Sequence, residues 1–165
     1  MKASEQEGVW LYRVLKKIDF FSECSLGEIE SLISNLIKKN YKKGQRVFNQ
    51  GDDADYLYIL FQGNVGIFVK SGIGKKKIAS LDSGNYFGEM SLVLGDKKSA
   101  TAVCETPCDF FLLFKNDFND FVYRNPSIKE KINRIIEKRN AEKNLELKSE
   151  KSGKGLLKKL FGFNK

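Results

Sequence analysis

The sequence predicts a mainly β domain, an antiparallel sandwich or roll, with helices at both ends. Short runs rich in Val, Ile, Phe and Tyr recur every eight to twelve residues through the middle of the chain, separated by glycine-containing turns. Apolar residues at helical spacing occupy the segments before and after these runs. With 165 residues, 41% apolar and 30% charged, the chain suits one soluble domain with a sizeable core.

The composition excludes several kinds of site. The chain has no His and three Cys, which excludes a Cys/His zinc site, a Ser-His-Asp triad and a four-thiolate site. No nucleophile–base pair is visible, so we expect no enzymatic activity, no metal and no cofactor. No apolar run approaches the ~18 residues that a membrane span needs, and residues 1–10 lack the apolar core of a signal peptide. We therefore expect a cytoplasmic protein with reduced thiols.

Two helices are predicted before the first strand. The first covers roughly residues 9–18, where apolar residues fall near helical spacing. The second opens with a capping box, in which Ser25 is the cap and Glu28 follows three residues later. Its apolar residues then recur at steps of three and four, so we expect this helix to run from Leu26 to Lys39.

Six strands are predicted after these helices, because the period of the apolar residues changes near residue 41. The runs between the glycine turns are short and rich in β-branched and aromatic residues, as strands of an antiparallel sheet are. The predicted strands are Arg46–Gln50, Tyr56–Gln62, Val65–Lys70, Lys76–Leu81, Ala100–Cys104 and Phe110–Phe114.

Two further helices are predicted after the last strand. The first is capped by Asn116 or Asp117 and ends at Pro126, since the residue before a proline disfavours the helical conformation. The second opens with a capping box at Ser127 and extends to about Asn144, where its apolar stripe fades into charge. The stripe consists of Ile128, Ile132, Ile135 and Ile136.

Most of the net charge of +8 lies at the C-terminal end. Residues 129–165 hold 12 Lys and Arg against 5 Asp and Glu. Residues 149–155 have the composition of a flexible linker. Residues 153–165 suit a short amphipathic helix with a basic face, which is typical of a segment that binds an anionic membrane or a partner's groove. A disordered, solubilising end is the alternative. The apolar residues of this segment are Leu156, Leu157, Leu160 and Phe161, and the lysines between them are Lys158 and Lys159.

Three segments of the chain resemble the cyclic-nucleotide-binding domain family. Leu15–Leu32 is similar to its entry helices, Gly44–Val69 to its first strands and Phe87–Val103 to its phosphate-binding cassette. The family includes catabolite-activator-type bacterial sensors and the regulatory subunits of cyclic-nucleotide-dependent kinases. The order and spacing of the segments carry the resemblance, which covers roughly residues 10–140.

The resemblance makes the expected fold and domain limits more specific. It implies a double-stranded β-helix, a jelly-roll-like β-roll, with N-terminal helices and C-terminal lid helices. Residues 1–148 would form the cyclic-nucleotide-binding-like domain, and residues 149–165 the linker and tail. The lid contacts would come from Ile132, Ile135 and Ile136.

The resemblance also implies a ligand site in the cassette. The phosphate would lie between Lys98 and the turn Met90–Leu94, because backbone N–H groups and a lysine both favour an anion. The carboxylate of Glu89 would accept a hydrogen bond from a ribose hydroxyl, and Gly88 would let the backbone approach the ligand closely. The implied ligand-binding residues are Gly88, Glu89, Met90, Ser91, Lys98, Ser99 and Ala100.

The cassette departs from the family's pattern at one position. Members that bind cyclic nucleotides well usually have Pro-Arg where this chain has Lys97-Lys98. An arginine can bond two phosphate oxygens at once, whereas a lysine acts as a point charge. The loss of one charge-assisted hydrogen bond costs about 1.5–3 kcal/mol. We therefore expect Lys98 to hold a phosphate less tightly than an arginine would.

Two functions follow from the sequence. The first is a stand-alone regulatory module that senses cyclic AMP or cyclic GMP and signals to a partner protein. The second is an interaction or membrane-anchoring module that keeps the fold but binds no nucleotide. The residues after Arg139 are too few for a helix-turn-helix domain, so we expect no sequence-specific DNA binding. A homodimer through the C-terminal helix is left open.

Overall fold

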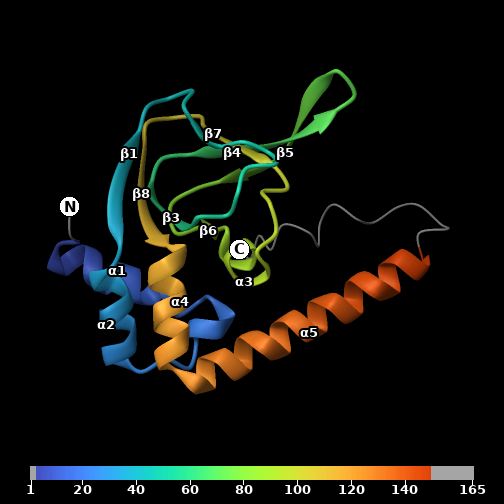
Figure 1. Ribbon diagram of the computed structural model, residues 1–165. Helices are drawn as coiled ribbons and strands as arrows, with labels where there is room; N and C mark the ends of the chain where they lie inside the picture. The colour runs from blue at the N-terminus through green and yellow to red at the C-terminus, as the bar shows by residue number, and fades with distance from the viewer. Residues whose placement is uncertain (1–2, 150–165) are drawn as a thin grey trace.

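Two four-stranded antiparallel sheets form the body of the computed structural model, which describes residues 3–149 (Figure 1). The strand order is β1-β8-β3-β6 in one sheet and β2-β7-β4-β5 in the other. The prediction of a mainly β roll with flanking helices is therefore confirmed. The strands are β1 (Ile37–Tyr41), β2 (Arg46–Phe48), β3 (Tyr56–Gln62), β4 (Val65–Ser71), β5 (Gly74–Leu81), β6 (Tyr86–Phe87), β7 (Thr101–Cys104) and β8 (Cys108–Phe114).

Most of the helices lie at one end of the roll. The exception is α3, which lies between β6 and β7 along the chain. In Figure 1, α1, α2 and α4 lie together, and α5 starts beside them and runs away to the other side of the molecule. The helices are α1 (Glu5–Leu15), the 3-10 helix η1 (Asp19–Phe21), α2 (Leu26–Ser34), α3 (Glu89–Leu94), α4 (Lys115–Arg124) and α5 (Pro126–Ser149).

Strands β3 and β8 are buried on both faces, because successive side chains of a strand point to opposite sides of its sheet. Tyr58 and Leu60 of β3 face the interior of the roll, where they pack with Phe110 and Leu112 of β8. The alternate side chains of the same strands pack instead against the helices. The two strands therefore belong to two hydrophobic clusters. The helix-facing side chains are Leu57, Ile59, Phe111 and Leu113.

The prediction that one helix runs from Leu26 to Lys39 was wrong in its last part. Helix α2 ends at Ser34, although it begins with the predicted capping box of Ser25 and Glu28. The residues Ile37–Tyr41 form β1 and pair with β8. Pairing with β8 buries Tyr41 in the roll and overrides the local helical spacing, which leaves Ile37 half exposed.

The predicted caps of the C-terminal helices were also wrong. Helix α4 starts directly after Phe114 without a side-chain cap, so the predicted caps Asn116 and Asp117 lie inside it. Helix α5 begins at Pro126, which suits the first helical position because a proline has no N–H to satisfy there. Ser127 is therefore inside the first turn of α5 rather than its cap.

Helix α5 also extends beyond the predicted end at Asn144, to Ser149. The proposed boundary between residues 148 and 149 stays a prediction, and the segment 153–165 lies outside the described residues. Among residues 3–149, no helix is long and apolar enough to cross a membrane. The same part of the chain holds no group of three His, Cys, Asp or Glu side chains that could bind a metal ion.

Candidate functional site

The cassette begins with a glycine in a conformation that other residues rarely adopt. Gly88 precedes α3 and has φ 91° and ψ −1°, in the left-handed region. A Cβ atom at this position would lie 2.7 Å from the carbonyl oxygen of Tyr56 and 3.0 Å from the Nζ atom of Lys98. Gly88 therefore lets the cassette backbone come close to β3 and to the lysine.

Lys98 is fixed by backbone hydrogen bonds to the turn between β2 and β3. Its N–H donates to the carbonyl oxygen of Asp52 at 2.8 Å, and its own carbonyl accepts from the N–H of Gly51 at 2.7 Å. The two bonds hold the backbone of Lys98 against this turn. The side chain is thereby directed inward, and the residue is only 5% exposed.

The ammonium group of Lys98 lies over two aromatic rings. Its Nζ atom is 4.8 Å from the ring centre of Phe48 and 5.2 Å from that of Tyr58. A cation at this distance from a ring face is attracted by the ring's quadrupole. The Nζ atom nevertheless has no hydrogen-bond partner within the described part of the chain. Lys98 is therefore a buried cation whose donors are not used by described residues.

Burial determines the acidity of this lysine. Removal from water lowers the pKa of Lys98 to about 8, because burial disfavours the charged form. The carboxylates of Glu89, Asp55 and Asp52 act in the opposite direction and raise this pKa. At neutral pH most of the lysine is therefore charged, while above pH 8 the neutral amine prevails.

The structure brings some of the predicted site residues together and separates others. Glu89 is the first residue of α3, is buried and is close enough to Lys98 to affect its pKa. Ser91 is half buried in α3, and its carbonyl accepts from the N–H of Gly95 at 2.9 Å. Ser99 is exposed, whereas Ala100 is buried in the interior of the roll. Met90 lies within α3.

Two residues beside the lysine were missed by the sequence analysis. Phe48 of β2 and Tyr58 of β3 were assigned to strands without a role in the site. The chain has 13 Phe and 6 Tyr, and nothing in their spacing marks these two. Burial raises the pKa of Tyr58 well above its usual range, so this phenol stays neutral. The two rings come together only because β2 and β3 belong to facing sheets.

The predicted lid residues pack on the helical cluster. Ile132 is buried, and Ile135 and Ile136 are half buried at the edge of the cluster that also contains Leu92 of α3. Helix α5 therefore contacts the cassette helix through apolar side chains. Whether it closes over a ligand stays a prediction.

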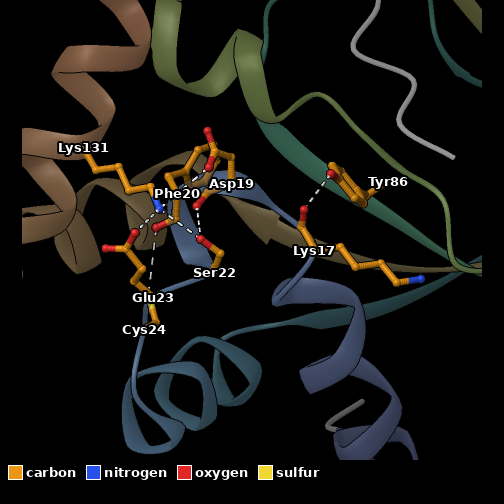
Figure 2. A network of polar contacts seen from close by, with 8 residues as sticks. All are labelled: Lys17, Asp19, Phe20, Ser22, Glu23, Cys24, Tyr86 and Lys131. Carbon is orange, nitrogen blue, oxygen red and sulfur yellow. Dashed lines mark hydrogen bonds and ion pairs between the residues drawn. The ribbon is translucent and has the colours of Figure 1, made fainter.

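A polar network links α5 to the segment that follows α1 (Figure 2). The Nζ atom of Lys131 lies 2.9 Å from the Oγ atom of Ser22, 3.0 Å from a carboxylate oxygen of Glu23 and 3.7 Å from one of Asp19. In the same segment, the carbonyl oxygen of Lys17 accepts a hydrogen bond at 3.3 Å from the hydroxyl of Tyr86, two residues before Gly88. Residues 17–23 therefore contact both α5 and β6, the strand that leads into the cassette.

The three cysteines are buried and free of disulfides. Burial raises the pKa of Cys24 to about 11 and that of Cys104 to about 12. The thiolate is the reactive form of cysteine, so these thiols are unreactive at neutral pH. They serve as small apolar core residues.

Comparison with known proteins shows which family this chain matches. The family model described as "Cyclic nucleotide-binding domain" matches residues 38–125. The cyclic AMP receptor protein of Thermus thermophilus is 31% identical over 134 residues, which is 81% of this chain and 62% of that protein. The cGMP-dependent 3′,5′-cGMP phosphodiesterase A of Dictyostelium discoideum is 30% identical over 140 residues, covering 85% of this chain and 16% of the relative.

A solved structure has the same fold and similar sequence. The structure of cAMP-bound PfPKA-R superposes with a TM-score of 0.68 at 30% identity, over 73% of this chain and 43% of that chain. This chain therefore spans less than two thirds of the length of each of these relatives. The matched range 38–125 contains the whole segment from Gly88 to Ala100.

Proposed function

Because the chain belongs to the cyclic nucleotide-binding domain family, we propose that it is a regulatory domain that binds cyclic AMP or cyclic GMP and signals to a partner protein. The observation that carries this proposal is the buried ammonium group of Lys98, which has no hydrogen-bond partner among the described residues. A cyclic phosphate would supply both the acceptor oxygens and the negative charge that this group lacks.

The energetics support a phosphate at this position. A buried donor without a partner costs about 1–3 kcal/mol, and more when it is charged. A ligand oxygen that accepts from Lys98 would remove this cost. A side chain at position 88 would crowd the same Nζ atom, because a Cβ there would lie 3.0 Å from it. Glu89 follows Gly88 directly, is buried and is close enough to Lys98 to affect its pKa, so its carboxylate could accept from a ribose hydroxyl of the same ligand.

The relatives support the ligand class but not the choice between its members. Their names refer to both cyclic AMP and cyclic GMP. Isothermal titration calorimetry of the full chain with each nucleotide tests the proposal directly, with the open-ring 5′-monophosphates and inorganic phosphate as controls. Saturable binding of a cyclic nucleotide, with weaker binding of the controls, is the expected result. No binding of either nucleotide would contradict it and favour a module that acts through protein or membrane contacts.

Replacing Glu89 with alanine should weaken binding of cyclic nucleotides about ten- to a hundredfold, because one hydrogen bond to a charged group is lost. The 2′-deoxy nucleotide provides the matched control, since it lacks the hydroxyl that the carboxylate would bind. The variant and the wild type should bind the 2′-deoxy ligand with similar affinity near pH 6.5, where Lys98 is charged in both. An equal loss for both ligands in the calorimeter would remove the ribose contact from the proposal.

Ligand should also slow amide hydrogen exchange in α5, if this helix is the lid. The helix is held by Ile132 in the apolar cluster and by Lys131 at residues 19–23. Mass spectrometry of peptides from residues 126–138 measures the effect, and peptides from the exposed hairpin of β4 and β5 serve as the internal control. Unchanged exchange in α5 at saturating ligand would leave the helix a structural element without a lid role.

A further inference from the structure

A groove between α1 and α2 lies at the end of the molecule away from the cassette. Its volume is about 570 Å³. No residue that we assign to the nucleotide site lines it. The side chains that matter for its chemistry are Val9, Tyr12, Leu26, Ile33, Glu5 and Glu30.

The groove exposes apolar surface that the rest of the fold does not use. Val9 is 56% exposed and Leu26 is 59% exposed, and both belong to the few large apolar side chains with such exposure among the described residues. Ile33 and Tyr12 are partly buried beside them. A contiguous apolar patch of this kind marks a surface for association.

The charge of the groove suits a basic occupant. Glu5 and Glu30 are exposed at the groove, and neither forms an ion pair within residues 3–149. No lysine or arginine lines the groove. An amphipathic helix with an apolar face and neighbouring lysines would therefore match it in both apolar surface and charge.

The chain itself contains such a segment. Residues 156–161 read LLKKLF, in which Leu156, Leu157, Leu160 and Phe161 recur at steps that place them on one face of a helix. Lys158 and Lys159 fall between them. If the apolar face packed in the groove, the two lysines beside it would lie near the two carboxylates of the groove.

The length of the chain disfavours binding of the segment to the groove of its own copy. Helix α5 has 24 residues and is therefore about 36 Å long. It starts near α1 and α2 and runs away from them (Figure 1). The chain from Ser149 to Leu156 spans at most about 25 Å even when fully extended. Even fully extended and doubled back along α5, the chain would leave Leu156 short of the start of that helix, so another copy is the more favourable source of the occupant.

We propose that residues 156–161 of one copy bind the groove between α1 and α2 of a second copy. The contact is heterologous, because the groove of one copy and the segment of the other are different surfaces of the chain. Such contacts close into rings or continue as open chains. An apolar face of about two turns favours weak, reversible association, with a dissociation constant of about 10 μM to 1 mM.

Two full-chain variants test the proposal by sedimentation velocity. Val9→Lys places a charge in the groove at an exposed helical position, and Leu160→Asp places one on the apolar face of the segment. Each variant alone should be monomeric where the wild type self-associates, with a loss of at least about tenfold in association constant. An equimolar mixture of the two should form a one-to-one dimer, because one intact groove then meets one intact segment.

The control is Ile73→Lys, which alters an even more exposed apolar side chain in the turn between β4 and β5, away from the groove. It should leave self-association unchanged. The proposal is overturned if the wild type stays monomeric up to about 1 mM, if Val9→Lys has no effect, or if the mixture stays monomeric. Loss of binding to phosphatidylserine vesicles in Leu160→Asp, with a monomeric wild type, would assign the segment to a membrane instead.

Discussion

Replacing Lys98 with arginine should tighten cyclic-nucleotide binding about ten- to a hundredfold. A guanidinium group can bond two phosphate oxygens in a fixed geometry, whereas the ammonium group offers a point charge. One additional charge-assisted hydrogen bond contributes about 1.5–3 kcal/mol. Calorimetric titration near pH 7 measures the difference. Because Lys98 is packed between two rings, a longer side chain must share the space that its ammonium group now occupies.

The same substitution should change how binding depends on pH. A bound phosphate favours the charged lysine and raises its pKa above the value of about 8 in the free protein. Wild-type affinity should therefore be nearly constant below pH 7 and fall above pH 8, by about tenfold per pH unit. Binding near pH 8 should take up a proton, seen as a dependence of the binding enthalpy on the buffer. The arginine stays charged, so the variant should lose this dependence.

The adjacent lysine supplies a matched control. Lys97 is exposed and forms an ion pair with Asp53 at 2.6 Å, outside the buried site. Lys97→Arg should therefore alter neither the affinity at pH 7 nor its fall at high pH. Equal effects of the two substitutions would mean that the gain does not come from a contact made by the side chain at position 98. A Lys98→Arg variant with unchanged affinity would show that the phosphate does not bond to this side chain.

Replacing Gly88 with alanine should lower the free energy of unfolding by about 2–4 kcal/mol. Part of this loss is backbone strain, because φ is 91° at this position. The remainder is steric, since the new Cβ would lie 2.7 Å from the carbonyl oxygen of Tyr56, a backbone atom of a buried strand. The cassette would have to move away from β3. Urea unfolding of the ligand-free protein measures the change.

Gly95→Ala separates the strain from the steric contact. Gly95 ends the same helix, has φ 71° and has no atom within 4 Å of an ideal Cβ. Its substitution should therefore cost only the strain, about 1–2 kcal/mol, and should leave the cassette in place. If both alanine variants lose the same stability, the close approach at Gly88 has no energetic consequence. Nucleotide affinity should fall much more in Gly88→Ala than in Gly95→Ala.

The sequence was sufficient where local chemistry decides the structure. The capping box at Ser25 and Glu28 formed as predicted because its bonds lie within one turn. The limits of the central strands were predicted well because glycine-containing turns precede and follow these strands. The sequence-based prediction failed where pairing between residues far apart in the chain decides the structure. Residues 37–41 continue a helical spacing but become β1, since β8 offers a partner strand. The short β6 was missed because two residues carry no period.

In the candidate site too, the residues close together in the sequence were predicted and those brought in by the fold were not. The cassette residues Gly88, Glu89 and Lys98 could be found from a contiguous motif, since one turn and one short helix hold them. The rings of Phe48 and Tyr58 come from strands of different sheets, so no spacing in the sequence connects them to Lys98. The lowered pKa of this lysine could not be predicted from the sequence either, because it results from burial in the folded roll.

Because β3 and β8 are buried on both faces, we expect the helical layer and the roll to unfold as one cooperative unit. Detaching the helices would expose the far face of the sheet, including Ile59 and Phe111, which are fully buried. Residues 38–125, the part matched by the family model, hold both strands but neither α1 nor α2. Cut out at these limits, the roll would keep α4 but lose α1, α2 and α5, which would expose part of the helix-facing side of the sheet to water. The segment that the family model matches is thus shorter than the segment that we expect to unfold as one cooperative unit.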